Sequence, residues 1–176
     1  MLKLKSATAL AIAAFAAPFA SAQAAIMGPD VAACAADARH AAALIVVEGF
    51  KNRAGTVRVR AFPANSPDLF RKEGAIDRIV VPVPASGKAA VCVPLPRPGV
   101  YAFDVRHDAN GNGDSDKSDG GGLSGNPRMT LWQALTKQRP AVKDVAIRVG
   151  DGVTPVPVIL NYVQGWSLGP VKTAER

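Results

Sequence analysis

The sequence has few of the residues from which most catalytic and metal-binding sites are built. Its 176 residues include two histidines, and His40 and His107 lie too far apart to show a zinc-ligand spacing. No Gly-x-Ser-x-Gly elbow occurs, and residues 122–125 only approach one. No glycine-rich loop precedes a predicted helix to hold a phosphate. These absences favour a protein that is not an enzyme.

Beyond the N-terminal segment, no apolar run reaches the roughly 18 residues that a transmembrane helix needs. Residues 1–24 begin with Lys3 and Lys5, continue with an apolar run from Ala7 to Ala20 and end in small residues. This order predicts a secretory signal peptide, whose apolar part is too short to cross a bilayer. We therefore expect an exported protein, periplasmic or secreted, without a transmembrane segment.

The charge of the chain is only mildly positive. Without the two lysines of the signal peptide, 19 of the 21 basic residues remain against 14 acidic ones, which gives a net charge of +5. The basic residues are dispersed along the sequence and are not interleaved with aromatic residues. This pattern is typical of a solvated surface and argues against a nucleic-acid partner. Contact with an anionic polymer of the cell envelope is the alternative.

The chain has exactly two cysteines, Cys34 and Cys92. In an oxidising compartment such a pair most often forms one disulfide, which would stabilise the fold by roughly 4 kcal/mol on the chain-entropy model. Residues 31–34 also resemble the lipobox of bacterial lipoproteins, which would instead place a lipid anchor on Cys34. Against a lipobox, Gly28, Pro29 and Asp30 separate these residues from the apolar run.

Short apolar segments with turn signals between them recur along the rest of the chain. The expected strands are residues 42–48, 55–61, 76–83, 88–95, 100–107, 145–149 and 156–163. Residues 50–54, 84–87 and 150–152 are the expected hairpin connections, and residues 129–138 the one short helix. Seven short strands predict an all-β fold, an antiparallel β-sandwich, with a small barrel as the alternative.

These segments define the expected domain organisation. After the signal peptide we expect a lead-in at residues 25–40, the β-sandwich domain at residues 41–163 and a loosely held C-terminal tail at residues 164–176. Trp166 is the residue that could pin this tail. About 150 mature residues correspond to one ordinary domain.

The most informative segment is the run of twelve residues from Asp108 to Asp119, which matches a calcium-binding loop in register. Glycine stands at the sharp turn of position six, as Gly113. The candidate calcium ligands at positions one, three, five, seven, nine and twelve are Asp108, Asn110, Asn112, Asp114 (through its backbone carbonyl), Asp116 and Asp119.

Three features weaken this match to a calcium loop. Asp119 is shorter than the usual glutamate at position twelve, Ser115 replaces an apolar residue, and a strand precedes the loop in place of a helix. Polar residues of these types also occur in any exposed connection between strands. If calcium binds, we expect a dissociation constant near 10⁻⁴ to 10⁻³ M and a structural role, because the ion would relieve repulsion among four carboxylates.

Three motifs in this order resemble an uncharacterised family of exported bacterial proteins, domain of unknown function family 2141. They are the connection with Gly49, Asn52 and Gly55, the segment Pro98-Gly99-Val100-Tyr101, and the segment from His107 to Gly113. The resemblance extends from about Leu44 to Tyr162. It implies an immunoglobulin-like or transthyretin-like sandwich and no established activity.

Two functions remain open from the sequence. The first is an exported, non-enzymatic module with a calcium-binding loop and a structural or interaction role, whose partner would be an envelope polymer or another protein. The second is a small secreted hydrolase that uses Asp104, His107 and Asp116. A hydrolase would need His107 and a carboxylate to converge in one pocket within hydrogen-bond reach.

Overall fold

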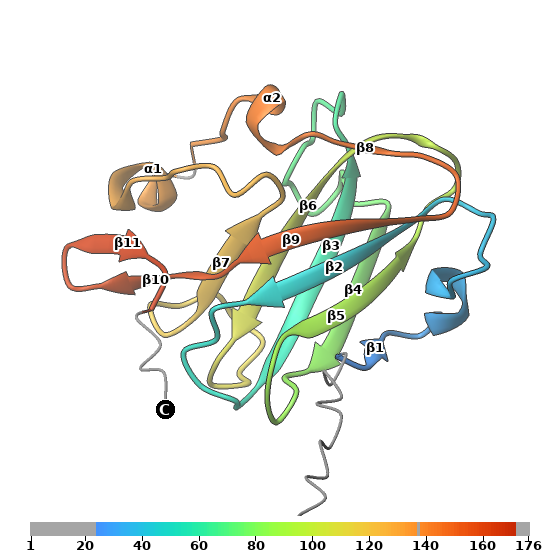
Figure 1. Cartoon of the computed structure of the whole chain (residues 1–176). Coiled ribbons are helices and arrows are strands. Elements are labelled where there is room, and N and C mark those ends of the chain that lie inside the picture. The colour runs from blue at the N-terminus through green and yellow to red at the C-terminus, as the bar shows by residue number, and fades with distance from the viewer. Residues whose placement is uncertain (1–23, 137, 172–176) are drawn as a thin grey trace, which may run out of the picture.

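The computed structural model describes residues 24–136 and 138–171, and it consists of two β-sheets with a few short helices (Figure 1). The predicted signal peptide, apart from Ala24, lies outside the described residues. The strands are β1 (Ile26–Met27), β2 (Ala42–Glu48), β3 (Thr56–Pro63), β4 (Asp77–Pro82), β5 (Ala89–Pro94), β6 (Gly99–Asp108), β7 (Gly120–Leu123), β8 (Ile147–Val149), β9 (Val153–Ile159), β10 (Asn161–Gln164) and β11 (Ser167–Gly169).

The larger sheet has seven strands, in the order β11-β10-β7-β6-β3-β4, and β8 pairs with the beginning of β6. The smaller sheet has four strands in the order β1-β5-β2-β9 and lies across the larger one in Figure 1. This arrangement is consistent with the predicted β-sandwich. The long strand β6 is central in the larger sheet, where β3 flanks it on one side and β7 and β8 on the other.

The hydrophobic core lies between the two sheets and follows the alternation of side chains along each strand. In β2, Ile45 and Val47 are fully buried, whereas Leu44 and Val46, on either side of Ile45, are only partly buried. The largest group of contacting buried residues draws on β2 to β6 and on β8 to β10. The sequence of β2 is a continuous apolar run that does not show which face points inward, whereas residues 57–60 of β3 alternate valine and arginine.

Three expected hairpin connections instead carry the chain from one sheet to the other. Residues 50–54 join β2 to β3, residues 84–87 join β4 to β5, and residues 150–152 join β8 to β9, and each pair belongs to different sheets. The turn residues were located correctly, but the inferred strand partners were wrong. Turn chemistry fixes where a chain reverses, whereas burial of two apolar faces decides which sheet the next strand joins.

The smaller sheet is mixed, which departs from the purely antiparallel arrangement expected. β2 runs antiparallel to β5 but parallel to β9, and β1 runs parallel to β5. The proline-containing strand β9 lies at the edge of its sheet, where a residue without an N–H group is tolerated. Pro155 and Pro157 are both exposed. Because they are two residues apart, the backbone positions at which they lack an N–H group lie on the same side of the strand.

The C-terminal third departs most from the expected boundaries. The expected strand at residues 156–163 is divided at Leu160, where the chain leaves β9 in one sheet and enters β10 in the other. The expected strand at 145–149 begins only at Ile147, because Val145 ends the short helix α2 (Val142–Val145). The expected helix at 129–138 is reduced to α1 (Leu131–Leu135), which starts with a capping box of Thr130 and Gln133.

The segment expected to be a loose tail from Gln164 forms, in its described part, a hairpin. β10 and β11 pair antiparallel, with Gln164 opposite Ser167. Trp166 stands at the tip of this hairpin with 97% of its surface exposed, so it does not pin the segment to the domain. The hairpin extends beyond the rest of the sheet beside α1 (Figure 1).

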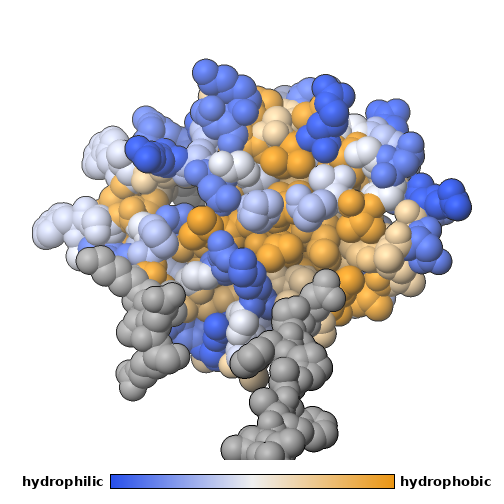
Figure 2. Space-filling model, viewed as in Figure 1, coloured by the Kyte–Doolittle hydropathy of each residue, from blue (hydrophilic) through white to orange (hydrophobic). Residues whose placement is uncertain are grey.

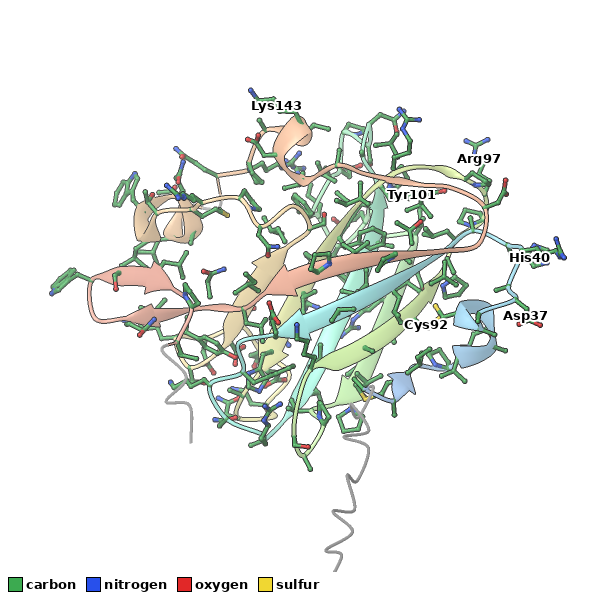
Figure 3. All side chains as sticks on the ribbon, in the orientation of Figure 1. Asp37, His40, Cys92, Arg97, Tyr101 and Lys143 are labelled. Carbon is green, nitrogen blue, oxygen red and sulfur yellow. A yellow bond between two sulfur atoms is a disulfide. The ribbon has the colours of Figure 1, made fainter. Side chains whose placement is uncertain are left out.

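The predicted disulfide between Cys34 and Cys92 is present, with 5.8 Å between the two Cα atoms (Figure 3). It joins the 3-10 turn η1 (Val31–Cys34) to β5, so the lead-in is tied to the smaller sheet by a covalent bond as well as by β1. In this structure the Cys34 sulfur is bonded to Cys92 and is not available for the thioether of a lipid anchor.

The outer face of the smaller sheet carries many apolar side chains. Figure 2 shows hydrophobic residues across the middle of this face, where Figure 1 places β2, β5 and β9. Leu44 and Val46 of β2 contribute to it, next to Pro155 and Pro157 of β9. Among the described residues, no helix is long and apolar enough to cross a membrane.

Removing the disulfide should lower the free energy of unfolding by about 4 kcal/mol or somewhat less, because the bond closes a loop of 58 residues in the unfolded chain. The test is urea denaturation of the double variant Cys34→Ser with Cys92→Ser against the oxidised wild type. The wild type under reducing conditions is the control and should match the double variant. Equal stability of the oxidised and reduced wild type would contradict the expectation.

Candidate calcium loop and the strand that carries it

Strand β6 positions the acidic loop and presents different side chains on its two faces. Tyr101, Phe103 and Val105 point into the core between the sheets, as the alternation predicted. Asp104 and Arg106 lie on the outer face of the larger sheet. Asp108 ends the strand, and residues 109–119 connect it to the neighbouring strand β7. The loop therefore starts from a rigid, fully paired strand.

The first half of the loop is wound by hydrogen bonds to the carboxylate of Asp108. One carboxylate oxygen accepts from the backbone N–H of Gly111 at 2.8 Å, and the other from that of Gly113 at 2.8 Å. Both glycines have positive φ, 71° and 83°, a backbone conformation that residues with a side chain rarely adopt. Glycine at positions four and six thus allows the chain to turn around Asp108.

Two asparagines continue the same winding and converge on Asp116. The side-chain oxygen of Asn110 accepts from the N–H of Asn112, and that of Asn112 from the N–H of Asp114. The amide nitrogens of Asn110 and Asn112 lie 2.7 and 3.0 Å from one carboxylate oxygen of Asp116. Loop positions three, five and nine therefore come together within hydrogen-bond distance.

Asp116 is held as a carboxylate by its neighbours in the loop. Its second oxygen accepts hydrogen bonds from the hydroxyl and the backbone N–H of Ser118. These bonds, together with those from Asn110 and Asn112, hold the pKa of Asp116 well below its ordinary value. A charge persists at this position even in mildly acidic solution.

The remaining candidate ligands close the loop or face solvent. The carboxylate of Asp119 accepts from the backbone N–H of Ala109 at 3.1 Å, which joins the end of the loop to its beginning. The side chain of Asp114 is exposed. Arg106 supplies a cation inside the loop, because its guanidinium donates to the Gly113 carbonyl and the Ser115 hydroxyl and lies 3.6 Å from Asp108.

The arrangement of the six predicted ligands limits how a metal could be held. Within residues 24–136 and 138–171, no three side chains of the types His, Cys, Asp and Glu converge as a metal site. A calcium ion at this loop would be bound by amide and backbone oxygens, water and one or two carboxylates. Such ligands suit calcium, and a carbonyl oxygen already accepting one hydrogen bond keeps a second lone pair.

His107, on the inner face of β6, is fully buried. Its exposed fraction is 0%, and its ring packs edge-on against the rings of Phe50 and Tyr162. Nε2 lies 2.9 Å from the Ala54 carbonyl, which can only accept, so Nε2 carries the proton. Nδ1 then accepts from the Tyr162 hydroxyl at 2.6 Å, and that hydroxyl accepts from the Lys51 N–H.

The three residues of the hydrolase alternative do not converge. His107 faces the core, where its hydrogen-bond partners are Tyr162 and the Ala54 carbonyl. Asp104 lies on the opposite face of β6, and both of its carboxylate oxygens are bonded to Arg60. Although it lies on the outer face of the sheet, Asp104 is buried. Asp116 is bonded within the loop, so this geometry offers no acid–base pair.

Ser124, in the segment that approaches a nucleophile elbow, has a structural position. It is fully buried, accepts from the backbone N–H of Phe103 and donates to the carbonyl of Val145. These bonds tie the end of β7 to β6 and to α2. A hydroxyl with both bonding directions satisfied by backbone does not act as a nucleophile.

The basic residues are less dispersed in space than in sequence. Arg58 and Arg60 of β3, Arg78 of β4 and Arg106 of β6 lie in neighbouring register positions on the outer face of the larger sheet. This group of arginines was not predicted from the sequence, because its formation depends on which strands pair. The alternation in residues 56–61, with arginine at every second position, was the available signal.

The family model described as an uncharacterised protein conserved in bacteria, DUF2141, matches residues 45–157, which is well over half of the chain. The chain belongs to this family. Comparison with curated proteins and with solved structures found no match. In this DUF2141 member the family region runs from β2 to β9 and includes the whole acidic loop.

Replacing Tyr162 with phenylalanine should lower the free energy of unfolding by about 1–3 kcal/mol near neutral pH, because buried His107 loses its donor. Burial raises the pKa of Tyr162 above its ordinary value of 10.0. The unfolded chain therefore loses the phenolic proton first, and the wild type loses stability as the pH rises from about 10 towards the folded pKa. The difference between wild type and variant should shrink over this range.

Urea denaturation of the wild type and of Tyr162→Phe, near pH 7 and above pH 10, measures this effect. All other titratable groups are common to the two proteins, so their contributions cancel in the difference. Tyr101→Phe is the matched control at neutral pH, because its hydroxyl donates to the Arg97 carbonyl at 2.8 Å near the edge of the domain (Figure 3). A difference between wild type and Tyr162→Phe that stays constant through the alkaline range would contradict the expectation.

Proposed function

We propose that this protein is an exported, non-enzymatic β-sandwich module whose acidic loop binds calcium, and that it has a structural or interaction role in the cell envelope. The observation that carries the proposal is the winding of the loop around Asp108, with Asn110, Asn112 and Asp116 brought together. The side-chain oxygens at positions one, three and five all accept backbone N–H groups. This bonding preorganises the loop before an ion arrives.

The role proposed for calcium is to fix the connection between β6 and β7. Asp108, Asp114, Asp116 and Asp119 place four negative charges within twelve residues, and Arg106 and Lys117 supply positive charge there. A divalent ion in the loop would reduce the repulsion among these carboxylates. Calcium that binds the folded state and not the unfolded state would stabilise the folded state by mass action.

Export is supported by two independent features. The N-terminal sequence has the order of a secretory signal peptide, and the single disulfide suits an oxidising compartment. The partner is proposed to be an envelope polymer or another protein. Partner binding would be compared with and without calcium, by pull-down from an envelope extract with the purified mature chain.

Calcium titration by calorimetry is the direct test. We expect binding with a dissociation constant of about 10⁻⁴ to 10⁻³ M, and about 10 mM calcium should raise the melting temperature by a few degrees. Asp116→Asn keeps the shape of the side chain and removes its charge, so it should weaken binding about tenfold or more. Magnesium should bind more weakly, because it needs a smaller octahedral site.

The matched control is Asp151→Asn, which makes the same change at an exposed residue between β8 and β9. This variant should bind calcium as the wild type does. The proposal fails if the wild type shows neither binding heat nor a higher melting temperature at about 10 mM calcium. It also fails if both aspartate variants lose affinity equally, because calcium would then bind by net charge alone.

A further inference from the structure

The outer face of the larger sheet contains a cavity of about 400 Å³ beside the acidic loop. This volume lies in the range of sites that bind small molecules. Arg58 and Arg106 line the cavity, as do the apolar residues Leu123, Val163 and Leu168. The β10–β11 hairpin and the segment around α1 thus border a site that extends from strands β3 and β6.

The strand register explains why these side chains meet. Arg58 of β3 pairs with Arg106 of β6, Arg106 pairs with Gly121 of β7, and Gly121 pairs with Asn161 of β10. These four residues form one row across the sheet and share its outer face. A Cβ atom added at Gly121 would meet nothing within 4 Å, so this position leaves the floor of the cavity open.

Arg58 carries a charge that its surroundings do not balance. Its Nε atom is buried without a hydrogen-bond partner, as is that of Arg106, and among the described residues no ion pair includes Arg58. Burial lowers the pKa of Arg58, and nearby Arg60 and Arg106 lower it further against the opposing effect of Asp104. Unpaired buried donors of this kind are costly unless something binds them.

Carboxylates also border the cavity, but each already has its own partners. Asp104 is bonded through both oxygens to Arg60. Asp116 accepts from Asn110, Asn112 and Ser118, and Asp119 accepts from the Ala109 N–H. Among the described residues, none of these carboxylates therefore forms an ion pair with the guanidinium of Arg58.

We propose that this cavity binds a small organic anion, with its carboxylate or phosphate group on Arg58 and Arg106 and its apolar part on Leu123, Val163 and Leu168. An arginine recognises either oxyanion through paired N–H donors. Asn161, at the end of the row, adds a side-chain amide that can donate to the same group. Two of the candidate calcium ligands, Asp116 and Asp119, border the cavity, but the proposed anion contacts are other residues and do not require an ion in the loop.

The test is calorimetric titration of the purified mature chain with octanoate and with octyl phosphate, in buffer containing a chelator so that calcium plays no part. Octanamide is the uncharged probe of matched length. At least one of the two anions should bind about tenfold or more tightly than octanamide, because a hydrogen bond to a charged group is worth about that factor. The better anion identifies which oxyanion the site prefers.

Two variants locate the binding. Arg58→Gln should weaken anion binding about tenfold or more while the melting temperature stays the same or rises, since an unbalanced charge is removed. Gly121→Leu should fill the floor and abolish binding of the anions. Arg78→Gln is the matched control, because Arg78 is exposed on the same face and does not line this cavity.

The proposal is overturned if neither anion binds at millimolar concentration, or if octanamide binds as well as both anions. It is also overturned if Arg58→Gln and Arg78→Gln weaken binding equally, because attraction would then be a general effect of surface charge. A marked fall in the melting temperature of Arg58→Gln would assign Arg58 a role in the fold in place of a role in binding. Failure of calcium binding at the loop would leave these outcomes unchanged.

Discussion

The alternation of side chains along β6 is the constraint on which the rest of the structure depends. Residues with odd numbers from Tyr101 to His107 are buried between the sheets, so the even-numbered ones must occupy the outer face. A shift of one residue would place Asp104 and Arg106 in the apolar core. Register along this one strand therefore fixes the core, the arginine row and the starting point of the acidic loop together.

The inner face of β6 ends in a polar group that the core accommodates only because it is fully bonded. His107 is linked through Tyr162 to the backbone of Lys51, and directly to the carbonyl of Ala54. This chain of bonds connects the β2–β3 crossing, β6 and β10, which belong to distant parts of the sequence. A buried imidazole without these partners would be strongly unfavourable, so the bonds fix the crossing next to the loop.

Much of the fold could be predicted from local patterns, whereas strand partners could not. The period of two located the inward faces of β3 and β6, because alternation along a strand is a local signal. The presence of exactly two cysteines located the disulfide, because only one pairing is possible. The crossings at residues 50–54 and 84–87 read as hairpins, since a turn has the same composition whether the strands pair or separate. The arginine row depends on pairing between β3, β4 and β6, and no local pattern specifies it.

Arg106 links the two polar regions of this face, because its guanidinium donates hydrogen bonds to the loop and the residue also lines the cavity. Without calcium, the negative charge near Asp108 holds this guanidinium towards Gly113 and Ser115. A divalent ion in the loop would take over part of that role and weaken the attraction between Arg106 and Asp108. More of the positive charge of Arg106 would then be available to an anion beside Arg58, so the two sites are expected to assist each other.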